Sequence, residues 1–452
     1  MRGLPPGLRR LAREAAIIVG VVALGAFLVY HFTVHTIRNT RPLGGSNVEV
    51  AREAGDQTET SFAVDPARPS VLVGALEALE VYSSADGGLN WRRGASPELP
   101  AGTCAAGRPR LAIGSRGREY LAFLSSFCGD SLTPHLVLVS RPGPAGAWGP
   151  VAGVAPPTWK YGFDDGPDLA VDRRRGRLYL AWTRSLSPAL ATVVVSSSVD
   201  DGRTWAPPQP VSRTLQRPHL ASVASGPGGS VYVAGIDARR GIWVARSGDG
   251  GHTFAPPRTA APLRANPAPD CALTALPTVT PLPGEAQTCT GPNPTLLVRG
   301  DRVFVVYLDV GENGSQEVFV AALDRDLRLL FRAQINPHER HQAQQFLPTA
   351  AVDTATGVLW ACWYDTTFDP RGHRAWFTCS ASHDGRRWSG PERAEDRPIK
   401  PTDLLSVHLA MFPSVVASDG VAHAFWPDAR VVDRGLDIFT ASLPERAAFA
   451  AG

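Results

Sequence analysis

Charged side chains recur at the ends of short apolar runs, where loops begin. Aspartate ends four of these runs, Arg239, Arg371 and Arg430 stand a few residues further on, and Glu59 and Asp165 precede two other runs. An arginine can hold a ligand carboxylate through two parallel hydrogen bonds, and Asp or Glu can act as general acid or base. The predicted catalytic residues are therefore Glu59, Asp165, Asp365 and Asp428, and the predicted ligand-binding residues are Asp237, Arg239, Asp309, Arg371 and Arg430. The alternative is that these groups form ion pairs and turn caps that anchor loops.

Two other segments could contribute to a ligand site. Trp159 and Tyr161 in "TWKYGFDD" could stack on a sugar ring or simply pack within the fold. His338 stands in "HERHQ" with His341, but two histidines without a third ligand are a weak metal signal. The sequence therefore predicts no metal site and no cofactor.

A repeat of about fifty residues positions these groups. Each unit has an apolar strand, a tight polar turn and a second apolar strand, and many units continue into a third strand. The first strands are predicted at 61–66, 109–114, 167–172, 218–223, 294–299, 348–353 and 413–418. This period is typical of a β-propeller with four-stranded blades. We expect seven blades, with residues 47–53 supplying the missing last strand and closing the ring, and six blades as the alternative.

One motif, S-x-D-x-G-x-x-(W/F), recurs where a third strand must turn into a fourth. The aspartate can accept backbone N–H groups of its own turn, and the aromatic ring can pack beneath it. We therefore interpret the repeated aspartates as structural. The four copies, the last one residue shorter, are Ser84, Asp86, Gly88 and Trp91; Ser198, Asp200, Gly202 and Trp205; Ser247, Asp249, Gly251 and Phe254; and Ser382, Asp384, Gly385 and Trp388.

These four copies resemble the Asp boxes, or bacterial neuraminidase repeats, of sialidase-like β-propellers. The resemblance covers about residues 47–443. It implies an all-β propeller whose active face lies opposite the motif turns, and it suggests sialidase chemistry. The family's marker arginine, two residues before the proline of a first strand, is absent at all seven matching positions. Arg108 and Arg217 stand directly before proline instead, where strand alternation would turn the side chain to the other face.

The N-terminal segment differs from the rest of the chain. Residues 15–34 contain no Asp, Glu, Lys or Arg, and as a helix they would be about 30 Å long, enough to cross a bilayer. Four arginines precede this segment, so we expect a cytoplasmic tail at 1–14, a membrane anchor at 15–34, a linker at 35–46 and an extracytoplasmic propeller at 47–452 on a bacterial cell surface. A cleaved signal peptide is the alternative. The net charge of +3 gives no sign of a nucleic-acid partner.

Six cysteines fit an exported protein, in which disulfides persist. Proximity in the sequence predicts the pairs Cys104–Cys128, Cys271–Cys289 and Cys362–Cys379. Zinc binding is the alternative, although no Cys-x-x-Cys spacing supports it.

Three functions remain open from the sequence. The first is binding of a glycan or cell-wall carbohydrate on the face opposite the motif turns, without sialidase chemistry. The second is glycoside hydrolysis by an acidic pair, and the third is a protein-interaction scaffold. The missing marker arginine favours the first over the second.

Overall fold

The computed structural model describes most of the chain after residue 42. The described residues are 43, 45–51, 57–129, 134–154, 164–187, 190–211, 221–237, 241–264, 280–282, 285–290, 294–312, 314–337, 343–369, 374–399, 413–428, 430 and 435–450, with the backbone alone for 185–187, 190, 237, 280–282 and 285–290. The predicted tail at 1–14 and anchor at 15–34 lie outside these residues. Among the described residues, no helix is long and apolar enough to span a bilayer.

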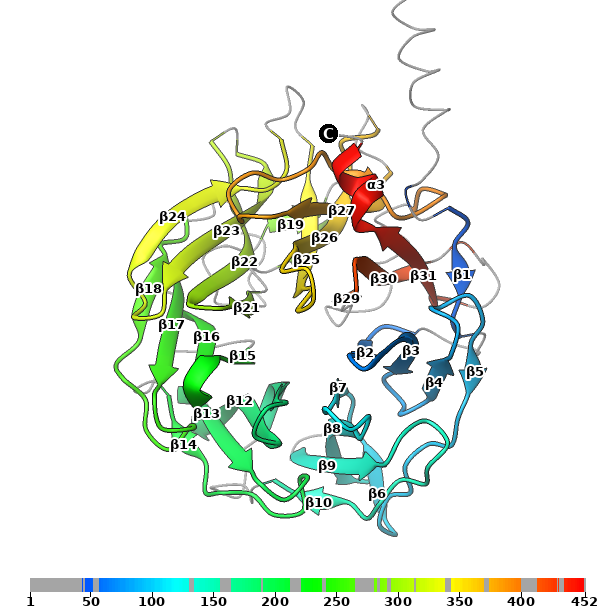
Figure 1. Ribbon diagram of the computed structural model, residues 1–452, viewed down its shortest axis with the longest axis vertical. Coiled ribbons are helices and arrows are strands. Elements are labelled where there is room, and N and C mark those ends of the chain that lie inside the picture. The colour runs from blue at the N-terminus through cyan, green and yellow to red at the C-terminus, as the bar shows by residue number, and fades with distance from the viewer. Residues whose placement is uncertain are drawn as a thin grey trace, which may run out of the picture. The chain divides into compact units, whose positions relative to one another are not determined.

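Seven antiparallel blades are arranged around a common centre in the described part of the chain, as Figure 1 shows, which confirms the prediction of seven. The first three blades are β2 (Ser61–Asp65), β3 (Arg68–Ala75), β4 (Val81–Ser84) and β5 (Arg92–Arg93); β7 (Arg110–Ile113), β8 (Glu119–Phe127), β9 (His135–Arg141) and β10 (Ala152–Gly153); and β11 (Asp164–Asp172), β12 (Arg177–Ser187), β13 (Leu190–Ser198) and β14 (Gln209–Pro210). The next two are β15 (Ser222–Ser225), β16 (Val231–Asp237), β17 (Gly241–Ser247) and β18 (Arg258–Ala261); and β21 (Thr295–Arg299), β22 (Arg302–Val310), β23 (Gln316–Asp324) and β24 (Leu329–Gln334). The last two are β25 (Gln345–Val352), β26 (Leu359–Asp365), β27 (Trp376–Ser382) and β28 (Glu392–Arg393); and β29 (Ser414–Ser418), β30 (Val421–Asp428), β31 (Asp437–Pro444) and β1 (Val48–Glu49).

Short elements supplement the blades. β6 (Thr103–Ala105) pairs with β8 beside β7, and β19 (Thr280–Leu282) pairs with β20 (Glu285–Thr290) as a separate hairpin. A 3₁₀ turn, η1, covers Pro227–Gly229, and helix α3 covers Glu445–Ala450, directly after β31 in the chain.

The first strand of the fourth blade departs from the sequence prediction. Ser222 pairs with Ala234 in the same register in which Thr295 pairs with Val306 in the fifth blade. Ala221 therefore holds the position that proline holds in five of the other six blades and Thr60 holds in the first. The prediction that Pro218 begins this strand was wrong, because the sequence offers a proline three residues too early.

Residues near the start of the propeller close the ring. β1 pairs with β31, with Val48 opposite Thr440 and Glu49 opposite Phe439. The seventh blade thus takes its outer strand from the N-terminal segment, as the sequence predicted. Closure in this way removes two exposed sheet edges.

The hydrophobic core is divided among the seven junctions between neighbouring blades. Each of seven clusters takes buried side chains from two adjacent blades. At the closing junction the rings of Phe62 and Phe425 stack with centroids 3.6 Å apart, and Trp91 meets both of them edge-on. The core therefore exists only where two blades meet.

The four motif turns connect third to fourth strands, in the first, third, fourth and sixth blades. In each turn the serine Oγ donates to the aspartate Oδ1, at 2.6–3.3 Å, and accepts a hydrogen bond from the glycine N–H, at 2.8–2.9 Å. The aspartate also accepts backbone N–H groups of its own turn, as Asp200 does from Thr204 at 2.9 Å. These bonds, with the Thr204 hydroxyl first among them, lower the pKa of Asp200 to about 2. The motif aspartates are thus engaged in hydrogen bonds within their own hairpins.

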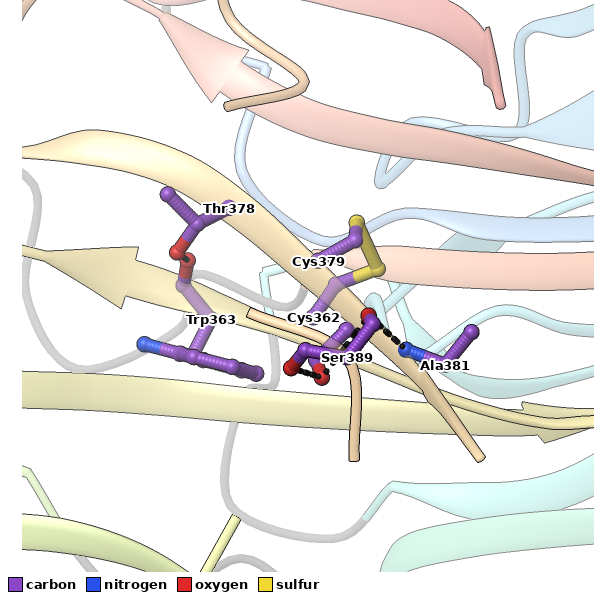
Figure 2. The surroundings of a disulfide bond; sticks show 7 residues. Cys362, Trp363, Thr378, Cys379, Ala381 and Ser389 are labelled. Atoms are coloured by element: carbon purple, nitrogen blue, oxygen red, sulfur yellow. Dashed lines mark hydrogen bonds between the residues drawn. A yellow bond between two sulfur atoms is a disulfide. The ribbon is translucent and has the colours of Figure 1, made fainter. Parts of the chain in front are cut away.

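Two of the predicted disulfides are present. Cys104 is bonded to Cys128, and Cys362 to Cys379. Figure 2 shows the second bond, which joins residues directly opposite each other on β26 and β27. In the neighbouring residue pair, Thr378 donates to the Trp363 carbonyl at 3.2 Å. The predicted pair Cys271–Cys289 lies outside the described side chains.

A buried histidine at the closing junction makes stability depend on pH. His423 shares a hydrogen bond of 3.0 Å with Ser442, whose hydroxyl donates to Gly87 of the first motif turn at 3.1 Å. Burial lowers the pKa of His423 from 6.5 to about 4. The unfolded chain therefore takes up this proton more readily than the folded chain.

We expect stability that is complete above pH 6.5 to be lost as the pH falls toward 4, by up to ~3 kcal/mol from His423. Urea unfolding at pH 7 and pH 4.5 measures this loss. His423→Gln is the control and should lose less stability over the same interval. Identical pH dependence in the two proteins would contradict the assignment.

Candidate functional site

A cavity of about 240 Å³ lies in the centre of the propeller, where the first strands of all seven blades converge. One polar side chain from each blade lines this cavity, at matching register positions. These residues are Ser61, Arg110, Asp168, Ser222, Thr295, Thr349 and Ser414. The first strands begin at the end of the propeller opposite the motif turns, since strands alternate in direction within a blade.

Some of these hydroxyls also join neighbouring blades. Ser61 Oγ accepts a hydrogen bond from the Leu111 N–H of the second blade, at 2.9 Å. Ser222 Oγ accepts one from the Leu296 N–H of the fifth blade, at 3.1 Å. The cavity wall is therefore held by contacts between blades as well as within them.

Arg110 and Asp168 are the charged pair of the cavity wall. Arg110 Nε lies 3.9 Å from Asp168 Oδ1, while Asp168 Oδ2 accepts hydrogen bonds from Val223 N–H at 2.8 Å and Ser222 Oγ at 3.1 Å. Burial lowers the pKa of Arg110, and the Asp168 carboxylate opposes that shift. The carboxylate is thus fixed by the fourth blade and presents its charge to the arginine of the second.

Arg108, just before the first strand of the second blade, contacts two of the predicted catalytic residues, Glu59 and Asp165. Its Nη1 lies 3.3 Å from Glu59 Oε1, its Nε donates to Asp165 Oδ1 at 3.1 Å, and its backbone N–H donates to Glu59 Oε2. The side chains of Glu59, Arg108 and Asp165 are 6%, 22% and 36% exposed, so the site opens on the Asp165 side. We call these three residues with Arg110 and Asp168 the channel-mouth site.

The backbone of Arg108 explains why its side chain reaches this site. Its φ of 58° is in the left-handed region, directly before Pro109. Gly166 and Leu347 take the same conformation before Pro167 and Pro348. For Arg108, the expectation that an arginine directly before proline faces the other way fails, because it assumed a regular strand. Arg217, the other arginine of this kind, lies outside the described residues. Such conformations in a non-glycine residue are uncommon and often occur at functional sites.

Glu59 lies against Gly107, two residues before Pro109. A Cβ on Gly107 would lie 2.5 Å from Glu59 Oε2, and the φ of Gly107 is +80°. A larger side chain at this position would therefore require the Glu59 carboxylate to move.

The Glu59 carboxyl is more deeply buried than the Asp165 carboxyl. Burial raises the pKa of Glu59, while Arg108 opposes the shift and Glu77 adds to it. Glu77 is exposed and accepts a hydrogen bond from Thr58 at 2.6 Å. Because Glu59 and Asp165 contact one guanidinium, their carboxylates lie within about 9 Å of each other. That range includes the separations found in glycoside hydrolases.

Asp365 and Asp428 are buried, away from the cavity. Asp365 accepts hydrogen bonds from Trp363 Nε1 at 3.1 Å and from Thr367 N–H at 2.8 Å, and burial raises its pKa. Asp428 accepts hydrogen bonds from Trp426 Nε1 at 3.3 Å and from Arg430 Nε at 2.7 Å. Neither aspartate is brought together with Glu59 and Asp165. Their contacts fit the alternative interpretation, in which these groups form ion pairs and turn caps that anchor loops. Each of the two aspartates stands two residues after a buried tryptophan that donates a hydrogen bond to it.

The predicted ligand-binding residues are scattered. Asp309 is buried and bound by Arg332 at 2.5 Å and by the Arg264 N–H at 3.0 Å. Arg430 is occupied by Asp428 and by Asp396, the latter at 2.6 Å. The side chains of the remaining predicted residues lie outside the description: Asp237, Arg239, Arg371, Trp159, Tyr161 and His338. In the described part, no group of three His, Cys, Asp or Glu side chains could hold a metal ion.

Sequence reasoning did not select Arg108, Arg110 or Asp168. Arg108 and Arg110 flank Pro109 in "RPR", and Asp168 directly follows Pro167 in "DGPD". The position directly after the first-strand proline is the one at which Arg110 and Asp168 line the cavity.

Comparison with known proteins shows which solved structures share the fold. No family model and no curated protein matches the chain. An α-L-arabinofuranosidase of Fusarium graminearum, solved with an iminosugar inhibitor, is 11% identical, with 89% of this chain and 99% of that chain covered and a TM-score of 0.50. A Hadza microbial sialidase is 14% identical over 83% and 74% of the two chains (TM-score 0.45), and an ulvan lyase of polysaccharide lyase family 25 is 13% identical over 90% and 99% (TM-score 0.47). The first of these likenesses shows a shared propeller fold.

The ion pairs of Arg108 can be tested directly. Arg108→Met should lower the free energy of unfolding by ~3 kcal/mol, because it leaves the buried Glu59 carboxyl without its cation. Urea denaturation measures the loss, and the double variant with Glu59→Gln should recover much of it. Arg118→Met is the control, since its ion pair with Asp201, at 3.6 Å, is exposed on both sides and should contribute under ~1 kcal/mol. Equal losses in Arg108→Met and Arg118→Met would contradict the assignment.

Proposed function

We propose that this protein binds a carbohydrate at the channel-mouth site and that it is a sialidase-like propeller whose motif turns are Asp boxes. The observation that carries the proposal is the cavity itself, in which charged and hydroxyl groups from seven blades converge. Sugars are recognised by such convergent hydrogen-bonding groups in a preformed hollow. The arabinofuranosidase with the same fold was solved with an iminosugar inhibitor, which supports the choice of ligand class.

The charges of the site favour an uncharged sugar over a sialic acid. Three carboxylates, those of Glu59, Asp165 and Asp168, face two guanidiniums, those of Arg108 and Arg110. A ligand carboxylate would have to compete with them for both arginines. We therefore propose a neutral glycan, such as a cell-wall polysaccharide, as the ligand.

Glycoside hydrolysis is the second candidate. It is favoured by the burial that raises the pKa of Glu59, since a carboxyl with a raised pKa can act as a proton donor, and by the partly exposed Asp165 carboxylate on the other side of Arg108. In this alternative Glu59 is the general acid, and Asp165 is the base or nucleophile.

A binding assay separates these functions. The full chain, in a detergent without sugar headgroups, should be retained on neutral oligosaccharides and not on sialosides. Asp168→Asn should weaken retention at least tenfold, because Asp168 lines the cavity. Arg203→Gln, exposed in the third blade's motif turn, is the matched control and should not change it. No retention on any neutral glycan, or preference for sialosides, would reject the proposal.

The same assay tests for catalysis. Hydrolysis predicts release of reducing sugar that is lost in Glu59→Gln while binding remains within a few fold. Binding without any product excludes the second candidate for the glycans tested.

We also propose that residues 15–34 anchor the protein in the membrane, with the propeller outside the cell. The two disulfides support an oxidising compartment. The full chain should sediment with membranes after a high-salt wash, whereas a variant lacking residues 1–42 should not, and external protease should cleave the propeller of intact spheroplasts. Recovery of the full chain in the soluble fraction would contradict the anchor.

A further inference from the structure

A second cavity, of about 280 Å³, lies on the face of the propeller that carries the motif turns, between the fourth and fifth blades. Its walls come from η1, from the motif turn after β17, and from the turns that follow β21 and β23. These are all first-to-second or third-to-fourth connections, so the cavity is remote from the channel-mouth site. The residues that line the cavity include Ser230, Tyr232, Arg246, Gly248, Asp301 and Arg325.

A glycine of the motif lines the cavity. Gly248 occupies the second position of S-x-D, where the other copies have Ala85, Val199 and His383. Gly248 is exposed, and a Cβ on it would meet nothing within 4 Å. A larger side chain therefore has room beside the cavity, as His383 has in the sixth blade, where its ring stacks on Phe449 of α3 with centroids 4.0 Å apart.

Two arginines supply hydrogen-bond donors to this space. Arg246 Nη1 lies 3.8 Å from Asp326 Oδ1, but its Nε–H is buried without a hydrogen-bond partner among the residues that the structure describes. Arg325 is exposed, and its carbonyl accepts the Tyr232 hydroxyl at 3.3 Å, which fixes the turn that carries it. Guanidinium groups bind carboxylate, sulfate and phosphate oxygens through paired N–H donors.

Asp301 adds an acceptor to the same wall. Its carboxylate suits the hydroxyl groups of a ligand, which donate hydrogen bonds to it. The cavity lining, with two guanidiniums and one carboxylate, therefore matches a molecule with an anionic group at one end and hydroxyls at the other. Asp326, which lies 3.8 Å from Arg246, is outside that lining. The volume of the cavity is at the small end of the range for ligand pockets, which suits a single ring.

We propose that this cavity binds one acidic sugar unit, with its oxyanion on Arg246 and Arg325 and its hydroxyls on Asp301. The site is independent of the channel-mouth site, which would bind a neutral glycan. A protein with both sites would contact a polysaccharide of mixed charge through two faces.

The test is calorimetric titration of the full chain with D-glucuronate, glucose 6-phosphate, glucose and inorganic phosphate. In Asp168→Asn, whose channel-mouth site is impaired, the two acidic sugars should bind at least tenfold more tightly than either glucose or phosphate. Equal binding of glucose in that variant would overturn the oxyanion contact, equal binding of phosphate would overturn the sugar contact, and no binding of the acidic sugars would overturn the site.

Variants locate the binding. Arg325→Gln should weaken the binding of glucuronate at least tenfold, and Gly248→Phe should abolish it by filling the cavity. Arg203→Gln, in the corresponding turn of the third blade, and Asp168→Asn, in the channel, should leave it unchanged. Retained affinity in Arg325→Gln overturns the proposal even where Gly248→Phe fails to fold, which its melting temperature will show.

Discussion

The structure depends on closure of the ring by β1. Every part of the hydrophobic core lies between two blades, so the seventh blade is held only if its outer strand is supplied and its inner face meets the first blade. Asn47, just before β1, clamps this closure: its Nδ2 donates to the Ala394 carbonyl at 2.8 Å, and its Oδ1 accepts hydrogen bonds from Asp396 N–H at 2.7 Å and Arg430 at 3.1 Å. The buried Phe62–Phe425 stack completes it. Asn47, which lies outside the channel-mouth site, thus helps to hold the ring closed.

The channel-mouth site follows from that closure. Seven equivalent strand positions face one axis, so a single polar residue per blade is enough to build a wall of mixed hydroxyls and charges. The left-handed backbone before Pro109 adds the charged side chain of Arg108 next to this set. Arg108 uses this position to reach Glu59 and Asp165, which belong to different blades. The site is therefore a property of the closed ring, and no single blade contains it.

Much of the scaffold could be predicted from the sequence, because its signals are local and repeated. Strand-turn-strand periodicity indicated seven units, and the motif located four hairpins. The charged residues were harder to interpret. Asp365 ends an apolar run and Asp165 precedes one, and neither pattern predicts burial. Asp365 is buried and accepts a hydrogen bond from the Trp363 indole, while Asp165 is partly exposed beside Arg108. That difference depends on partners from other strands, and on a left-handed backbone that strand alternation does not predict.

Repetition itself separates scaffold from site in this protein. A residue present at the same position in every motif copy satisfies the same hairpin each time, as Ser198 and Asp200 do, and so carries no information about a ligand. A departure from the repeat changes one junction and leaves the others intact. Gly248 lines a cavity where the sixth blade carries His383 stacked on Phe449, and Gly107 leaves room for the Glu59 carboxylate. In a ring of near-equal blades, ligand sites are therefore best sought where one blade differs from the rest.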